Sequence, residues 1–298
     1  MIQKEKLFVG VDIGGTNFSS TLFNENNKII KNSRVQLIKQ FTNQTSLLDA
    51  ITEQIVEISN RKNISGIGFA CPGPLDTKLG KILDTPNLKL LKNCNFIDKM
   101  KTRLNIPCYI ENDANLFTLG EYNDYSNHNS KKDLFIGITI GTGLGMGVLI
   151  NGEIFCGAHG MAAEYGISPI NNKSWETNIS ISGIKKLSNK YYHKKIEPKN
   201  LYKMALNNDE NALKAWNNFG REVGLFLSHV INMLDPNVIS IGGGISKSFK
   251  FFQKSMKKIL VTHCPSYKYN KIDIFESKNK ELSAKLGAMI LVNKFQSS

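Results

Sequence analysis

The stretch VDIGGT at residues 11–16 follows an apolar run near the N-terminus, and the similar stretch TIGTG at 139–143 follows another in mid-chain. A second extended run comes after each of them, at 18–23 and at 145–150. We therefore predict strand, tight turn and strand in both places. Glycine lets a ligand approach the backbone closely, and successive N–H groups in such a turn form an anion-binding concavity. A plain β-hairpin is the alternative, but the duplication favours two phosphate-holding hairpins.

A third glycine-rich stretch, ISIGGGIS at residues 239–246, follows a short apolar strand and precedes an amphipathic segment. Its alternative is an ordinary strand-to-helix turn with Ser246 as N-cap. None of the three stretches has the P-loop spacing, and the glycines at 141–147 lie between two strands, unlike those of a Rossmann turn. Asp12 places a carboxylate beside a phosphate loop, which is useful if Mg²⁺ lies between them, directly or through water.

Composition restricts the class of protein. The chain has 298 residues, 41% hydrophobic and 21% charged, which is ordinary for a globular protein of two domains. We expect no export signal, because the first predicted strand begins near the N-terminus, and no membrane segment, because no apolar run is long enough to span a bilayer. The scattered cysteines favour a cytoplasmic location. Five scattered cysteines predict reduced thiols. The net charge of +13 is spread over short lysine pairs, so we expect anionic nucleotides rather than nucleic acid as partners.

Apolar periodicity predicts two similar α/β halves. The first half is predicted to hold strands at 7–13, 18–23, 28–36, 64–70 and 107–110 and helices at 46–59, 96–104 and 114–122. The polar stretch 123–132 is the predicted linker. The second half is predicted to hold strands at 133–140, 144–150, 153–155, 237–241 and 272–276 and helices at 177–190, 198–206, 209–234, 246–261 and 281–295.

These elements predict two domains. The N-terminal α/β domain covers 1–122 and is completed by the C-terminal helix at 281–298, while the second α/β domain covers 123–280. Ligands are expected in a cleft between the two.

A carboxylate follows the strand at 107–110, in the stretch ENDAN at 111–115. Phosphoryl transfer to an alcohol needs one carboxylate to orient the hydroxyl and accept its proton, plus donors and a metal to neutralise the phosphates. Asp113 fits the first task and the glycine turns fit the second. The alternative is that Asp113 only caps the helix at 114–122.

In combination these motifs resemble the ROK family of sugar kinases and regulators, within the wider group of actin, hexokinase and Hsp70-like proteins. The similarity runs nearly end to end, through DIGGT at 12–16, GFACPGPLD at 68–76, TPNL at 85–88, ENDAN at 111–115, IGTGLGMGVLINGEI at 140–154, GAHGMAAE at 157–164, DPNVISIGGGIS at 235–246 and LGA at 286–288. The resemblance implies an α/β, two-domain actin-like ATPase fold, related to ribonuclease H, with a central cleft. It also implies ATP and Mg²⁺ as cofactors, a small-molecule sugar as substrate and a homodimer.

The resemblance further implies roles for residues that match the family's motifs. Asp113 is implied as the catalytic base. The residues implied in sugar binding are Gly73, Asn87, Asn112, Glu164 and Glu176. Those implied in nucleotide binding are Asp12, Gly14, Gly15, Thr16, Thr142, Gly143, Gly243 and Gly244, with Asp12 also holding Mg²⁺.

The chain departs from the family pattern at the zinc site. Ile167 stands where the family usually has His, three residues after the glutamate that Glu164 matches, and the family's three cysteines are absent before Glu176. We therefore predict no structural zinc, with the metal clamp replaced by packing that involves Tyr165 and Trp175.

Two functions are compared. The first is an ATP-dependent kinase that phosphorylates the 6-hydroxyl of a hexose, with allose slightly favoured, then glucose or N-acetylmannosamine. The alternative is a non-catalytic sugar-binding or regulatory member of the family, and the early first strand leaves no room for a DNA-binding domain. Retention of the acidic and amide site residues favours the kinase: Asp12, Asn112, Asp113, Glu164 and Glu176.

Overall fold

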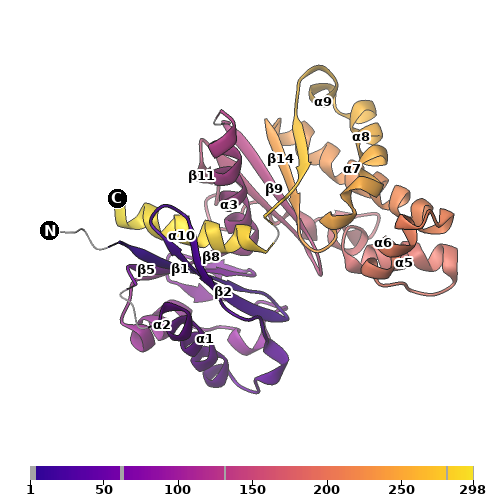
Figure 1. The fold of residues 1–298 in the computed structure, drawn as a ribbon. Helices are drawn as coiled ribbons and strands as arrows, with labels where there is room; N and C mark the ends of the chain where they lie inside the picture. The colour runs from indigo at the N-terminus through magenta and orange to yellow at the C-terminus, as the bar shows by residue number, and fades with distance from the viewer. Residues whose placement is uncertain (1–4, 61–63, 131, 280, 298) are drawn as a thin grey trace. The chain divides into compact units, whose positions relative to one another are not determined.

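The computed structural model describes residues 5–60, 64–130, 132–279 and 281–297. The chain divides into two compact units (Figure 1). Unit 1 comprises Met1–Asn129, Ile154–Ala162 and Glu281–Ser298, and unit 2 comprises Ser130–Glu153 and Ala163–Lys280. None of the helices in the described ranges is both long and apolar enough to cross a membrane.

The prediction of a linker at 123–132 is wrong for most of these residues. Helix α3 runs over Asp113–His128, so unit 1 extends to Asn129 rather than ending at residue 122. The stretch is polar, but it contains no glycine or proline before Ser130 that would stop the helix. The segment Ile154–Ala162 also belongs to unit 1, although the sequence placed it in the second domain.

A six-stranded sheet forms the centre of unit 1, with strand order β3-β2-β1-β5-β8 and β4 paired to β2. Strand β1 pairs antiparallel with β2 and parallel with β5, which pairs parallel with β8. The carboxyl ends of β1, β5 and β8 therefore meet at one edge of the sheet. The bounds are β1 Leu7–Ile13, β2 Asn17–Asn24, β3 Ile29–Asn32, β4 Gln36–Leu37, β5 Gly66–Cys71 and β8 Cys108–Asn112.

Helices cover both faces of this sheet (Figure 1). Alternation along β1 assigns the faces, because successive side chains of a strand point to opposite sides. Val9 and Val11 join the core under helices α1 (Gln44–Ser59) and α2 (Phe96–Leu104). Phe8 belongs to a separate cluster with Leu286 and Met289 of α10 (Leu282–Ser297), the helix that also packs on α3.

Unit 2 repeats this arrangement with the strand order β11-β10-β9-β14-β15. Strand β9 pairs antiparallel with β10 and parallel with β14, which pairs parallel with β15. The bounds are β9 Leu134–Ile140, β10 Leu144–Ile150, β11 Glu153–Ile154, β14 Val238–Gly242 and β15 Asp273–Glu276. The core of this unit lies around Trp216, Phe219 and Phe226 of α7. Its helices are α4 Trp175–Asn178, α5 Ile181–Tyr192, α6 Pro198–Leu206, α7 Glu210–Leu234, α8 Phe249–His263 and α9 Pro265–Tyr269.

Several short elements differ from the prediction. The helix predicted at 177–190 is two helices, α4 and α5, because Ser180 is extended between them. Ser246 does not act as an N-cap: its hydroxyl donates to the Gly243 carbonyl at 2.9 Å, and α8 begins later, at Phe249. The small hairpins and helix not predicted are β6 Leu75–Asp76 with β7 Lys81–Ile82, β12 Pro169–Ile170 with β13 Lys173–Ser174, and α9.

Candidate functional site

The first glycine turn joins β1 to β2 in unit 1. Ile13 pairs with Phe18, and the turn between them is closed by a hydrogen bond from the Gly14 N–H to the Asn17 carbonyl at 2.8 Å. A Cβ added at Gly15 would lie 2.7 Å from the Asn87 carbonyl oxygen. Glycine is therefore required for this close approach, which brings the predicted phosphate turn against the predicted sugar-pocket residue Asn87.

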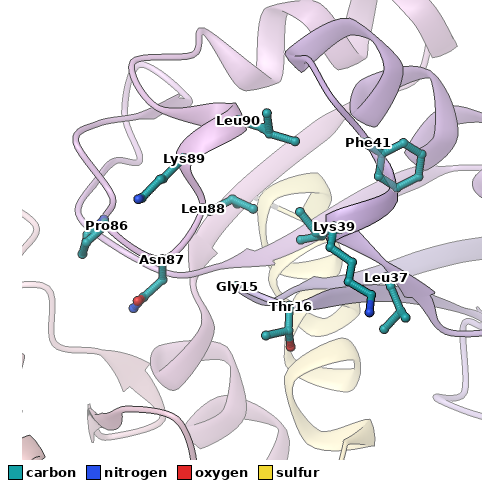
Figure 2. Close-up of a pocket in the computed structure, with 11 residues that line it drawn as sticks. Gly15, Thr16, Leu37, Lys39, Phe41, Pro86, Asn87, Leu88, Lys89 and Leu90 are labelled. Carbon is teal, nitrogen blue, oxygen red and sulfur yellow. The ribbon is translucent and has the colours of Figure 1, made fainter.

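A pocket of about 560 Å³ opens beside this turn in unit 1. Figure 2 shows the segments 37–41 and 86–90 on either side of it, with Gly15 and Thr16 between them. Its walls combine apolar side chains with Lys39 and Lys89. The volume and the mixture of apolar walls with few polar groups are typical of a small-molecule site.

Predicted site residues also lie at the carboxyl ends of the parallel strands. Asp12 is paired with Ala70 near the end of β5, and Cys71, the last residue of β5, is paired with Asn112 at the end of β8. Asp113 follows as the first residue of α3. Gly73, predicted to border the sugar pocket, lies just beyond β5. The sheet therefore gathers these predicted residues at one edge of unit 1.

The two carboxylates of this edge influence each other. Burial raises the pKa of Asp12 to about 7, with the neighbouring Asp113 charge as the next cause and Lys285 opposing the shift. Burial also raises the pKa of Asp113, against hydrogen bonds from the backbone. Both groups therefore lie in surroundings that disfavour a second uncompensated negative charge.

The start of α3 shows how Asp113 is held. Asn112, not Asp113, is the N-cap: its Oδ1 accepts from the N–H groups of Ala114 at 2.9 Å and Asn115 at 3.2 Å. Asp113 lies in the first turn and accepts from Ala114 N–H at 2.9 Å. The partial positive charge at a helix N-terminus stabilises an anion there. The capping alternative therefore applies to Asn112, and the Asp113 carboxylate is oriented by the helix that it begins.

Glu111 is a buried carboxylate in this region that the sequence analysis did not single out. It accepts hydrogen bonds from Asn112 N–H at 2.7 Å and from Asn115 Nδ2 at 3.0 Å, and burial raises its pKa. A charged residue directly after the apolar end of a predicted strand is the signal that could have identified it. Glu111 fixes the backbone of Asn112 and so supports the start of α3.

The donor set of unit 1 fits a magnesium ion. Asp12 offers carboxylate oxygens, the kind of ligand that Mg²⁺ takes, and it lies two residues before Gly14 of the predicted phosphate turn. Within the described ranges, no group of three or more His, Cys, Asp or Glu residues is arranged to hold a metal. Mg²⁺ commonly takes only one or two carboxylates and completes its shell with phosphate oxygens and water.

The second glycine turn joins β9 to β10 in unit 2. Ile140 pairs with Leu144, and a hydrogen bond from Gly141 N–H to the Gly143 carbonyl at 2.9 Å closes the turn. Glu176 Oε2 accepts from Leu144 N–H at 3.0 Å. A Cβ on Gly143 would lie 2.5 Å from that same oxygen. Glu176, implied in sugar binding, therefore lies directly against Gly143 of the predicted phosphate turn.

The third glycine stretch also lies near this turn. Gly243 has φ of +83°, and a Cβ there would be 2.4 Å from the Ile140 carbonyl oxygen. A Cβ on Gly244 would meet nothing within 4 Å. The predicted adenosine residues thus follow β14 where it runs beside β9, with open space at Gly244.

An aromatic cluster in unit 2 contains Tyr165 and Trp175, the two residues predicted to pack in place of a zinc clamp. Tyr165 packs on Phe226 with ring centroids 5.6 Å apart, and its hydroxyl is 3.0 Å from His229 Nδ1. Trp175 packs edge-on against both Phe226 and His229. The cluster therefore ties the turn that carries Glu164 (η3, Glu164–Ile167) and helix α4 to helix α7.

The short 3₁₀ helix of Glu164 also approaches the second turn. A Cβ on Gly166 would lie 2.2 Å from the Leu144 carbonyl oxygen. Because Glu176 accepts from the N–H of the same Leu144, both glutamates implied in sugar binding lie on elements that contact the first residue of β10. The structure thus groups the six predicted unit 2 residues Thr142, Gly143, Glu164, Glu176, Gly243 and Gly244 around the start of β10 and the ends of β9 and β14.

Comparisons with known proteins show which proteins this chain resembles. Glucokinase of Thermotoga maritima is 27% identical over 285 residues, covering 87% of this chain and 89% of the relative. N-acetyl-D-glucosamine kinase of Histophilus somni is 28% identical over 279 residues, covering 86% and 90%. A crystal structure of a ROK family glucokinase from Streptomyces griseus, in complex with glucose and AMPPNP, superposes with a TM-score of 0.84 at 23% identity. That superposition covers 97% of this chain and 99% of the other, and it shows that the two share the actin-like ATPase fold.

The sequence profile of the ROK family matches residues 8–295, nearly the whole chain. The chain belongs to the ROK family.

Proposed function

We propose that this protein is an ATP-dependent sugar kinase that transfers phosphate to the 6-hydroxyl of a hexose. Family membership over nearly the whole chain and relatives named as sugar kinases support this class of enzyme. The observation that carries the proposal is the placement of Asp113. Its carboxylate begins a helix at the edge of the unit 1 sheet, beside Asp12 and near the end of the strand that leads into the first glycine turn.

In the proposed mechanism, Asp113 orients the sugar hydroxyl and accepts its proton as the phosphate is transferred. The raised pKa of its carboxyl makes it a stronger base than an exposed aspartate. Asn112 uses Oδ1 for the helix cap, so its Nδ2 is the donor that it offers to the sugar. Asn87 and Gly73 border the same sugar in unit 1, and Glu164 and Glu176 accept from sugar hydroxyls.

The nucleotide is proposed to bind through the glycine stretches. Gly14, Gly15 and Thr16 of unit 1 and Thr142 and Gly143 of unit 2 offer N–H and hydroxyl donors to its phosphates. The open space at Gly244 supports a place for adenosine beside Gly243 and Gly244. When bound, Mg²⁺ would neutralise phosphate charge, and Asp12 would hold it directly or through water.

The sugar itself is proposed from the sequence motifs, with allose slightly favoured, then glucose or N-acetylmannosamine. The names of the relatives add N-acetylglucosamine to the hexoses worth testing. A coupled assay of ADP release with MgATP, run on these four sugars with mannose and fructose, tests both the class and the choice. No ADP release with any sugar, from folded protein, would overturn the kinase proposal.

Two further properties are proposed from the family pattern. The protein is a homodimer without structural zinc. Sedimentation analysis tests the first property, and elemental analysis tests the second, since about one zinc per chain would show that other residues bind the metal.

A further inference from the structure

Lysine 285 is a buried cation that the proposed mechanism does not use. It lies on α10 with 8% of its surface exposed, within a helix face that otherwise packs apolar residues onto the unit 1 sheet. Figure 1 shows α10 in yellow along the sheet of unit 1. Burying an ammonium group costs free energy unless an anion or hydrogen bonds compensate it. The residues around Lys285 therefore indicate what it does.

The backbone of α10 is held unusually close to β1 at this position. A Cβ on Gly10 would lie 2.0 Å from the Lys285 carbonyl oxygen. Because side chains alternate along a strand, Gly10 and Asp12 share the face of β1 that α10 covers. Lys285 therefore lies over β1 at Gly10, two residues before Asp12.

The side chain of Lys285 reaches the base of the first glycine turn. Its Nζ donates to Ser19 Oγ at 3.2 Å, and both residues are buried. Ser19 on β2 is the cross-strand partner of Asp12 on β1, so their side chains lie on the same face. Lys285 therefore contacts one strand of the hairpin directly and lies near the carboxylate of the other.

The charges around this ammonium are mainly negative. Asp12 and Glu281 both favour its protonated form, against the effect of burial, which lowers the pKa of Lys285. Asp113 is the further carboxylate that acts on Asp12. Lys285 is thus a cation that interacts with two carboxylates, and one of these, Asp12, also interacts with Asp113.

We propose that Lys285 is a positioning residue: its buried ammonium, fixed by Ser19, holds the Asp12 carboxylate in place and so sets the base of the first glycine turn. The inference rests on the proposed function only for the role of Asp12 toward the nucleotide. The C-terminal helix, more than 260 positions away in the sequence, then takes part in the site through one side chain.

A double-mutant cycle on nucleotide-free protein tests this role. The urea midpoint is measured above about pH 8, where folded Asp12, with its pKa raised to about 7, is ionised. The proteins compared are wild type, Lys285→Met, Asp12→Asn and the double variant. Lys285→Met is expected to lower the midpoint of wild type more than that of Asp12→Asn, where the ammonium keeps Ser19 and Glu281 but has lost Asp12. Equal lowering in both backgrounds would show that the side chain only packs, and would overturn the proposal.

Lys294→Met provides the matched control. It makes the same change of residue and net charge on the same helix, and its effect on the midpoint should be the same in both backgrounds. If Lys285→Met alone does not fold, the double variant should still fold. Failure of both variants to fold would also overturn the proposal, because packing would then be the main contribution of Lys285.

Activity gives a second readout. Lys285→Met is expected to lower kcat about 10–100-fold, the size typical of residues that orient a ligand-holding group, with a smaller change in the KM for sugar. Ser19→Ala removes only the hydroxyl and should lower kcat by a smaller factor. Normal kcat in both variants would overturn the role. The urea measurements need no substrate, so they test Lys285 even if no sugar is phosphorylated.

Discussion

The two glycine turns have similar scaffolds and different chemistry beneath them. Each follows the strand that pairs antiparallel with its successor and parallel with a later strand. In unit 1 the residue before the turn-flanking Ile13 is Asp12, while in unit 2 the equivalent residue before Ile140 is Thr139. The carboxylate near the second turn, Glu176, comes from a helix and accepts a backbone N–H.

This difference separates two tasks that a phosphate-transferring site requires. A glycine turn offers its backbone N–H groups to phosphate whatever side chains surround it. The same strand–turn–strand arrangement can therefore occur in both units. A carboxylate that binds a cation or accepts a proton must be held at one place in the site, here at the end of a strand. Its buried negative charge must also be balanced by a positive one. Unit 1 carries Asp12, Asp113 and Lys285 for this purpose, whereas Glu176 at the unit 2 turn also holds the turn, because its Oε2 accepts a backbone N–H.

The largest expected effect concerns Asp113. Asp113→Asn should lower kcat by about 10²–10⁴, because an amide cannot accept the proton of the sugar hydroxyl. Binding of MgADP, measured by calorimetry, should change little. Asp98→Asn, at an exposed position in the first turn of α2, is the matched control and should leave kcat unchanged. A near-normal kcat in Asp113→Asn would remove this residue from the role of base and remove the chemical difference between the units.

The second effect concerns the packing beneath the first turn. Gly10→Ala should lower the free energy of unfolding by about 1–3 kcal/mol or more, because the new methyl group meets backbone on α10 and neither element can move freely. Urea denaturation measures the loss. Gly141→Ala is the control in unit 2, where a Cβ would meet nothing within 4 Å. Similar losses in both variants would contradict the close contact between α10 and β1.

The third effect concerns the carboxylate at the second turn. Glu176→Ala should lower the free energy of unfolding by about 1–3 kcal/mol, since it leaves the Leu144 N–H without its acceptor. Glu176→Gln keeps an acceptor oxygen at this position and should lose less. If Gln and Ala give equal losses in urea denaturation, the hydrogen bond to the turn contributes little, and the comparison between the two turns would need another basis.

The sequence predicts the strands of both turns closely because their apolar residues repeat locally. Strands β1 and β10 begin and end at or within a residue of the predicted bounds. The polar residues after 122 predict a linker, but α3 continues to His128 because no glycine or proline there ends the helix. The pattern also does not predict the break between α4 and α5, where the backbone of Ser180 is extended, because no glycine or proline marks it at 179–182.

The same limit applies to the candidate site, where local motifs can be predicted and contacts between distant residues cannot. The turns and Asp113 are visible because each is a short local motif. The hydrogen bonds from Lys285 Nζ to Ser19 and from Leu144 N–H to Glu176 join residues far apart in sequence, so no local pattern could reveal them. A lysine within the apolar helix pattern at 282–292 was the available signal for Lys285.

The last expected effect is a pH dependence of stability that arises at Asp12, beside the first turn. The pKa of Asp12 is raised from 3.8 to about 7 in the folded protein, by burial and by Asp113, with Glu281 adding to this and Lys285 opposing it. Between these two values the folded state holds a proton that the unfolded state has lost, so this group makes stability fall as pH rises through the window. Nucleotide-free Asp12→Asn lacks this contribution.

The urea midpoint of Asp12→Asn should therefore gain on that of wild type as pH rises from about 4 to about 7, and the difference should be constant above about 8. Thr139→Val is the control at the equivalent position of unit 2, and its difference from wild type should be the same at every pH because neither side chain ionises. A pH-independent difference for Asp12→Asn would mean that its carboxylate ionises as easily in the folded chain as in the unfolded one. The cation near it would then fully compensate for its burial, and the charge contrast between the two turns would be smaller than the structure indicates.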